Sequence, residues 1–122
     1  MDQTILIVDD EVELAELLAM RLDMLGYSIY TANSAKRALE LCERHKIELV
    51  LSDIRMPEMD GVQMMDELKK SFPSIDICFM TGYADYDFEQ LILAGAIQVV
   101  SKPIDHKELV ALLKDYFAAK NS

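Results

Sequence analysis

Side chains of the kinds that bind metal ions and phosphate groups stand directly after four short apolar segments of this 122-residue chain. Three are carboxylates, one is a hydroxyl and one is an ammonium: Asp9, Asp10, Asp53, Thr81 and Lys102. Each has an ordinary structural explanation when taken alone, because aspartates often cap helices, threonines begin turns and lysines cover surfaces. Chance seldom puts all of them at the ends of apolar segments, so their coincidence indicates a functional site.

The chemistry of such a set follows from its charges. Carboxylates that gather in one crevice repel one another, so the site needs a compensating positive charge. Mg²⁺ is suited to this, because it prefers oxygen ligands and takes one or two carboxylates while keeping several waters. Lys102 adds a second positive charge, and Thr81 offers a hydrogen bond. One carboxylate can then act as nucleophile toward a phosphoryl group, since in-line transfer needs mainly positioning and charge neutralisation.

The pattern of apolar residues alternates between strand-like and helix-like segments along the whole chain. Strands are predicted at residues 5–8, 28–31, 48–52, 76–80 and 97–100. Helical spacing of apolar side chains predicts helices at about 14–25, 35–42, 62–72, 85–93 and 109–117. Gly26 is predicted to end the first helix and Asn33 to cap the second. Asp105 and Glu108 are predicted to form a capping box before the last.

This alternation predicts an α/β fold. Segments 5–8 and 49–51 are continuously apolar, as expected of parallel strands that are covered on both faces. Right-handed crossovers then produce a doubly wound three-layer sandwich. In such a sheet the functional site lies beyond the carboxyl ends of the strands, where the strand order reverses. The polar residues named above are predicted to meet at that edge.

The composition limits the classes of partner. The net charge is −10, from 22 acidic and 12 basic residues, and this field repels nucleic-acid backbones and anionic lipids. We therefore expect no direct nucleic-acid or membrane partner, whereas a divalent cation or a basic partner suits the charge. The first residues, MDQTILIVDD, lack the basic segment of a signal peptide. Cys42 and Cys78 lie in apolar stretches, which favours buried reduced thiols and a cytoplasmic protein over a disulfide.

Four sequence blocks carry a resemblance to a known family: ILIVDDE at 5–11, LSDIRMPEMDG at 51–61, MTGYAD at 80–85 and SKPID at 101–105. In their order and spacing, essentially the whole chain resembles the receiver domain of two-component response regulators. The resemblance implies a flavodoxin-like (βα)5 fold with a parallel five-stranded sheet in the order 2-1-3-4-5. It also implies a single receiver domain over residues 1–122, with 118–122 as a frayed tail or the start of a linker.

The resemblance assigns roles to the acidic residues. Asp53 would be the phosphoacceptor, taking its phosphoryl group from a phosphohistidine. Asp10 and Asp53 would bind Mg²⁺ directly, with Asp9 acting largely through water. The main-chain carbonyl of Arg55 would complete the protein ligands of the metal.

Further roles concern the phosphoryl group itself. The resemblance implies that Lys102 pairs with this group and that Thr81 bonds one of its oxygens after activation. Main-chain amides of Arg55 and Gly82 would bind the other oxygens. Pro103 would follow a cis peptide bond that orients Lys102.

The chain departs from the family at Val99, where receivers usually carry a tyrosine or phenylalanine that reports on the threonine. A valine has no ring to swing, so the usual coupling is expected to be absent or rerouted. Tyr83 and Tyr86 are candidates to replace it, with plain packing against the fourth helix as the alternative. Arg55 and Tyr83 flank the acceptor and are expected to modulate water access and the lifetime of the phosphoryl group.

The leading hypothesis is a phosphorylation-dependent signalling switch that is not an enzyme beyond assisting its own phosphorylation and dephosphorylation. Its donor would be a sensor histidine kinase or a phosphotransfer protein of a phosphorelay. Its fourth-helix and fifth-strand face would change for a downstream effector or a C-terminal output domain, and the fourth helix, fifth strand and fifth helix would form a dimer contact.

Two other functions compete with this hypothesis. A phosphorylation-independent interaction module is favoured by Val99 and opposed by the intact Asp53, Thr81 and Lys102. A Mg²⁺-dependent phosphatase would need a second acid two residues after its nucleophile, and Arg55 stands there.

Overall fold

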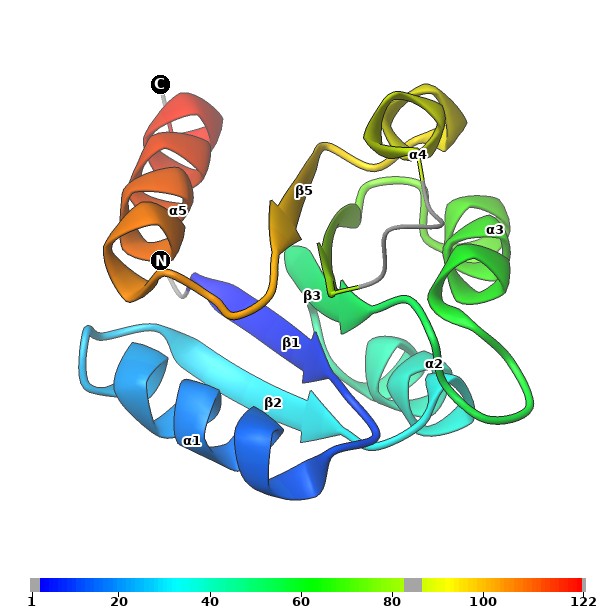
Figure 1. The fold of residues 1–122 in the computed structure, drawn as a ribbon, viewed down its shortest axis with the longest axis horizontal. Coiled ribbons are helices and arrows are strands. Elements are labelled where there is room, and N and C mark those ends of the chain that lie inside the picture. The colour runs from blue at the N-terminus through cyan, green and yellow to red at the C-terminus, as the bar shows by residue number, and fades with distance from the viewer. Residues whose placement is uncertain (1–2, 83–86, 122) are drawn as a thin grey trace.

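The computed structural model describes residues 3–82 and 87–121, and it alternates strand and helix five times (Figure 1). The elements are β1 (Thr4–Val8), α1 (Val12–Asp23), β2 (Ser28–Ala32), α2 (Ala35–Arg44), β3 (Leu49–Asp53), α3 (Gly61–Ser71), β4 (Asp76–Thr81), α4 (Phe88–Ala94), β5 (Gln98–Ser101) and α5 (His106–Lys120). The strands form one parallel sheet in the order β2-β1-β3-β4-β5. The predicted doubly wound fold and its strand order are confirmed.

Two apolar layers hold the sheet between the helices. Helices α1 and α5 pack on one face, and α2, α3 and α4 cover the other (Figure 1). All residues of β1 and β3 are buried, and alternate side chains enter the two layers. In β1, for example, Ile5 faces α1 and α5 whereas Leu6 faces the other three helices. The continuous apolar segments are therefore strands covered on both faces, as predicted.

The structure corrects several helix ends. The N-cap of α2 is Ser34, whose side chain accepts a hydrogen bond from the Arg37 amide at 3.1 Å, and not Asn33. Asp105 caps α5 by accepting hydrogen bonds from two main-chain amides. The full capping box found among the described residues belongs instead to Asp60 and Gln63, at the start of α3. Serine and asparagine cap helices about equally well, so residue type alone does not separate these positions.

Helices α4 and α5 also have ends that bear on the predictions. Helix α5 continues to Lys120, so residues 118–120 belong to this helix. Helix α4 begins at Phe88, and the first part of the predicted helix at 85–93 falls outside the described residues. The left-handed residue near the end of α1 is Gly26, at φ 98°, two residues beyond the C-cap Met24. Across residues 3–82 and 87–121, no helix combines the length and the apolar character that a membrane span requires.

Candidate phosphoacceptor site

The register of the sheet brings the ends of four strands to one edge. Val8, Ser52, Phe79 and Val99 are successive pairing partners across β1, β3, β4 and β5, and we call them the Ser52 row. Residues that pair laterally in a parallel sheet lie side by side, so the strand ends that follow this row lie together at one edge of the sheet. Asp53 and Thr81 are the last residues of their strands, one position later than predicted.

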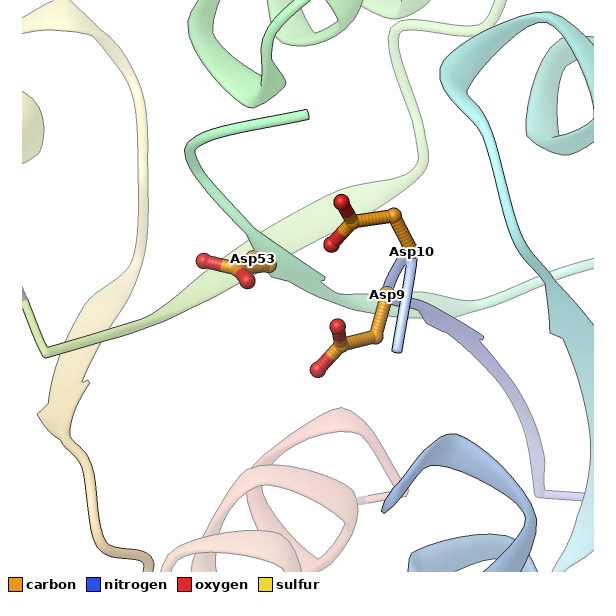
Figure 2. A group of neighbouring side chains, drawn as sticks. All are labelled: Asp9, Asp10 and Asp53. Atoms are coloured by element: carbon orange, nitrogen blue, oxygen red, sulfur yellow. The ribbon is translucent and has the colours of Figure 1, made fainter. Parts of the chain in front are cut away.

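Three carboxylates meet beyond the ends of β1 and β3. Asp9, Asp10 and Asp53 each offer a ligand oxygen, and these oxygens lie within 4.8 Å of one another (Figure 2). Asp9 and Asp53 are each only 3% exposed, whereas Asp10 is open to solvent. A donor set of hard carboxylate oxygens with one solvent-exposed member fits Mg²⁺, which binds oxygen and keeps part of its water shell.

Asp53 is held by two different donors. Its Oδ1 accepts a hydrogen bond from the main-chain amide of Ile54 at 2.8 Å. Its Oδ2 accepts one from the ammonium of Lys102 at 3.0 Å. The two oxygens of this buried carboxylate therefore have unlike partners, one uncharged and one cationic.

Lys102 also reaches Asp9, whose Oδ2 lies 3.1 Å from the ammonium nitrogen. Burial alone lowers the pKa of Lys102, but hydrogen bonds and Coulombic attraction from Asp53 and Asp9 outweigh it and raise the pKa above its ordinary value. The side chain thus stays charged at neutral pH. Asp9 Oδ1 accepts from the Glu11 amide at 2.9 Å, so this carboxylate also organises the turn before α1.

The ends of β4 and β5 are joined through the main chain. Thr81 is 2% exposed, and its carbonyl accepts a hydrogen bond from the Lys102 amide at 2.8 Å. Gly82 follows, and a Cβ added there would lie 3.5 Å from the Cβ of Lys102. The peptide bond between Lys102 and Pro103 is cis, as the resemblance implies. Thr81, Gly82 and Lys102 therefore lie together at the site.

Of the other residues predicted to act at the site, the structure describes Arg55 and Val99 but not Tyr83. Arg55 is exposed in the loop between β3 and α3. Val99 is 8% exposed and belongs to the same apolar cluster as Phe79 and Leu91. A buried aliphatic side chain thus occupies the position where the resemblance would place a mobile ring. Tyr83, like Tyr86, lies outside the described residues.

Two further residues contact the Asp53 main chain. The hydroxyl of Ser52 donates a hydrogen bond to the Asp53 carbonyl at 2.7 Å, and Gly61 packs against the same carbonyl. The sequence contains a signal for the first, because Ser52 is a hydroxyl residue inside an apolar strand. Gly61 stood in the sequence only as part of the turn that leads into the third helix.

Comparisons with known proteins agree with this geometry. The family model for the response regulator receiver domain matches residues 5–114. The transcriptional regulatory protein GlrR of Escherichia coli is 36% identical over 112 residues, which are 91% of this chain and 25% of GlrR. The chain thus spans about a quarter of the length of this curated relative.

Solved structures of receiver domains and response regulators are also similar to this chain. A receiver domain protein from Clostridium thermocellum has a TM-score of 0.89 at 26% identity, covering 97% of this chain and 96% of the other. The response regulator TrrA of Thermotoga maritima, solved with Mg²⁺ and BeF, has a TM-score of 0.83 at 33% identity, covering 94% and 98%. Since the family model covers most of the chain and the fold agrees, the chain belongs to the response regulator receiver domains of two-component systems.

Proposed function

We propose that Asp53 accepts a phosphoryl group from a phosphohistidine of a sensor histidine kinase or phosphotransfer protein. A carboxylate oxygen forms a new bond to phosphorus while the bond between phosphorus and the histidine nitrogen breaks, and that electron pair stays on the nitrogen. The observation that carries this proposal is the environment of Asp53. Its carboxylate is almost buried, touches an ammonium at 3.0 Å, and lies within 4.8 Å of two other carboxylates.

The neighbouring residues divide the work of binding the transferred group. Lys102 neutralises its charge, and the hydroxyl of Thr81 donates a hydrogen bond to one of its oxygens. Main-chain amides of Arg55 and Gly82 donate to the others. Oriented donors of this kind stabilise charge where it develops.

Mg²⁺ is the cofactor that we propose for the site. Asp10 and Asp53 would hold it together with the carbonyl of Arg55, and Asp9 would act through water. When bound, it supplies the charge neutralisation that three neighbouring carboxylates and a phosphoryl group require. The exposed Arg55 side chain would set how easily water reaches the acyl phosphate.

The readout surface in this proposal is the face of α4 and β5. Among the described residues, exposed apolar side chains lie on α4 and directly before β5: Phe88, Ile92, Leu93 and Ile97. Phosphorylation shifts an existing conformational equilibrium of this face, and a downstream effector, an output domain or a second copy of the chain binds the shifted state. Because Val99 is buried and has no ring, this shift proceeds without a swinging aromatic side chain at that position.

A direct test is to incubate the protein with Mg²⁺ and acetyl phosphate and to measure its intact mass. The wild type should gain one phosphoryl group, Asp53→Asn should gain none, and Asp66→Asn, which changes an exposed carboxylate on α3, should behave as the wild type. Uptake by Asp53→Asn equal to that of the wild type, or no uptake by the wild type, would contradict the proposal.

A phosphorylation-independent interaction module is the second candidate, and the buried Val99 favours it. In that case BeF with Mg²⁺ would leave the amide spectrum of α4 and β5 unchanged, and partner binding would be the same for wild type and Asp53→Asn. A phosphatase would instead release phosphate from unrelated phosphomonoesters through many turnovers.

A further inference from the structure

The peptide group between Asp53 and Ile54 links the acceptor carboxylate to its supports. Its N–H donates to Oδ1 of Asp53 at 2.8 Å. Its carbonyl oxygen, at the other side of the same rigid plane, accepts from the hydroxyl of Ser52 at 2.7 Å. Because a peptide group is planar, whatever fixes the carbonyl also fixes the direction of the N–H.

Ser52 is a buried hydroxyl on an otherwise apolar surface. Its residue is fully buried, and its pairing partners Val8 and Phe79 both lie in the apolar layer beneath α2, α3 and α4. A hydroxyl in such surroundings is costly unless it makes a hydrogen bond. The bond that it makes is to the carbonyl of Asp53.

Gly61 closes the other side of this carbonyl. A Cβ at that position would lie 2.5 Å from the Asp53 carbonyl oxygen and 3.1 Å from the Ile54 Cα. The Gly61 amide also donates to the Ile54 carbonyl at 2.7 Å, which joins the start of α3 to the chain directly after the acceptor. The peptide group therefore has a hydrogen-bonded side and a sterically closed side.

We propose that Ser52 and Gly61 are positioning residues for phosphoryl transfer, an inference that rests on the proposed function of Asp53. They hold the peptide group so that its N–H binds Oδ1 of Asp53. That bond fixes the rotation of the carboxylate and leaves Oδ2 directed at Lys102. Small displacements of a reacting group cost large factors in rate, so this support acts on the chemistry and not only on stability.

Ser52→Ala tests the proposal, because it removes the hydroxyl without adding volume. The rate of phosphorylation by acetyl phosphate should fall about fivefold, which corresponds to the net value of one hydrogen bond. The amide resonance of Ile54 should move upfield, and its hydrogen exchange should accelerate. Gly61→Ala should slow phosphorylation by at least as much and also move the Ile54 resonance, because the added Cβ displaces the carbonyl.

Thr4→Val is the matched control, since it removes a buried hydroxyl group from the amino end of β1, whereas the site lies at the carboxyl ends of the strands. It should leave the phosphorylation rate and the Ile54 resonance as in the wild type. An unchanged rate in Ser52→Ala, or a lower rate with an unmoved Ile54 resonance, overturns the proposal, as does an equal loss of rate in Thr4→Val. If the wild type takes up no phosphoryl group, the proposed function fails, and the Ile54 resonance still decides whether Ser52 positions Asp53.

Discussion

Replacing Lys102 by methionine removes the ammonium that lies between Asp9 and Asp53 while keeping a side chain of similar length. The ammonium nitrogen is 3.1 Å from Asp9 and 3.0 Å from Asp53, and both aspartates are only 3% exposed. The substitution leaves two neighbouring carboxylates without their cation, so we expect a large loss of stability in the absence of Mg²⁺.

The size of the loss follows from this burial. Removing one partner of a fully buried pair costs roughly 3–5 kcal/mol. The side chain of Lys102 is 23% exposed, so water replaces part of the lost interaction and we expect about 2–3 kcal/mol. An unfolding entropy of roughly 0.26 kcal/mol per kelvin for a chain of this length converts this to about 8–12 °C in Tm.

The assay is thermal unfolding followed by circular dichroism in EDTA at pH 7. Lys120→Met is the control, because Lys120 lies 3.7 Å from Asp76 at a site where the two side chains are 36% and 30% exposed, and such an ion pair contributes about 0–1 kcal/mol. Adding MgCl₂ should narrow the gap between Lys102→Met and the wild type, because the dication supplies the missing positive charge. Equal Tm values in EDTA, or a gap that Mg²⁺ leaves unchanged, would refute the reasoning.

The Tm difference between Lys102→Met and the wild type should depend on pH with a defined sign. Because the folded-state pKa of Lys102 is raised, its contribution to stability is fully present below its unfolded-state pKa of about 10.4. The contribution is lost as the pH rises through the raised folded-state pKa. The Tm difference between Lys102→Met and the wild type should therefore persist at neutral pH and narrow under strongly alkaline conditions.

Three other predictions concern regions away from this pair. Tyr116→Phe removes a hydroxyl that donates to Asp76 at 2.6 Å and should lower Tm by about 4 °C. Burial is the larger cause, and Asp76 the next, of the raised pKa of Tyr116, so the Tm difference between wild type and variant should shrink above about pH 10. Burial raises the pKa of Cys42 to about 11 and that of Cys78 to about 12, so a thiol reagent at pH 8 should label the unfolded chain but not the native one. Leu93→Lys, at a residue 86% exposed on α4, should leave Tm unchanged and weaken any self-association of the BeF-loaded protein measured by sedimentation.

The sequence predicted the layers of the fold well, because the period and length of its apolar segments report burial directly. The continuous apolar residues of β1 and β3 identified strands covered on both faces, and the structure agrees. The exact strand ends were harder to predict, because pairing with a neighbouring strand sets them. Asp53 pairs with Met80 and Thr81 pairs with Ser101, so both residues extend their strands by one position.

The meeting of the acidic residues and Lys102 at one edge of the sheet was also within reach of the sequence, but their contacts with one another were not. The alternation of elements was enough to gather Asp9, Asp53 and Lys102 at one edge. That Lys102 binds both carboxylates depends on the spatial order of strands far apart in the sequence. The support of Asp53 by Ser52 was missed for a similar reason, because a serine in an apolar strand does not reveal which carbonyl its hydroxyl reaches.

The Ser52 row also constrains which substitutions relatives of this chain can carry. Phe79 stands between Ser52 and Val99, and a Cβ at Gly61 would lie 3.0 Å from the ring of Phe79. The room for this large ring thus depends on small neighbours. A bulkier residue at 52 should be tolerated where the residue at 79 is smaller, so the side-chain volumes at these two positions should covary among homologues. Position 61 should stay glycine in either case, because a Cβ there would also lie 2.5 Å from the main-chain carbonyl of Asp53.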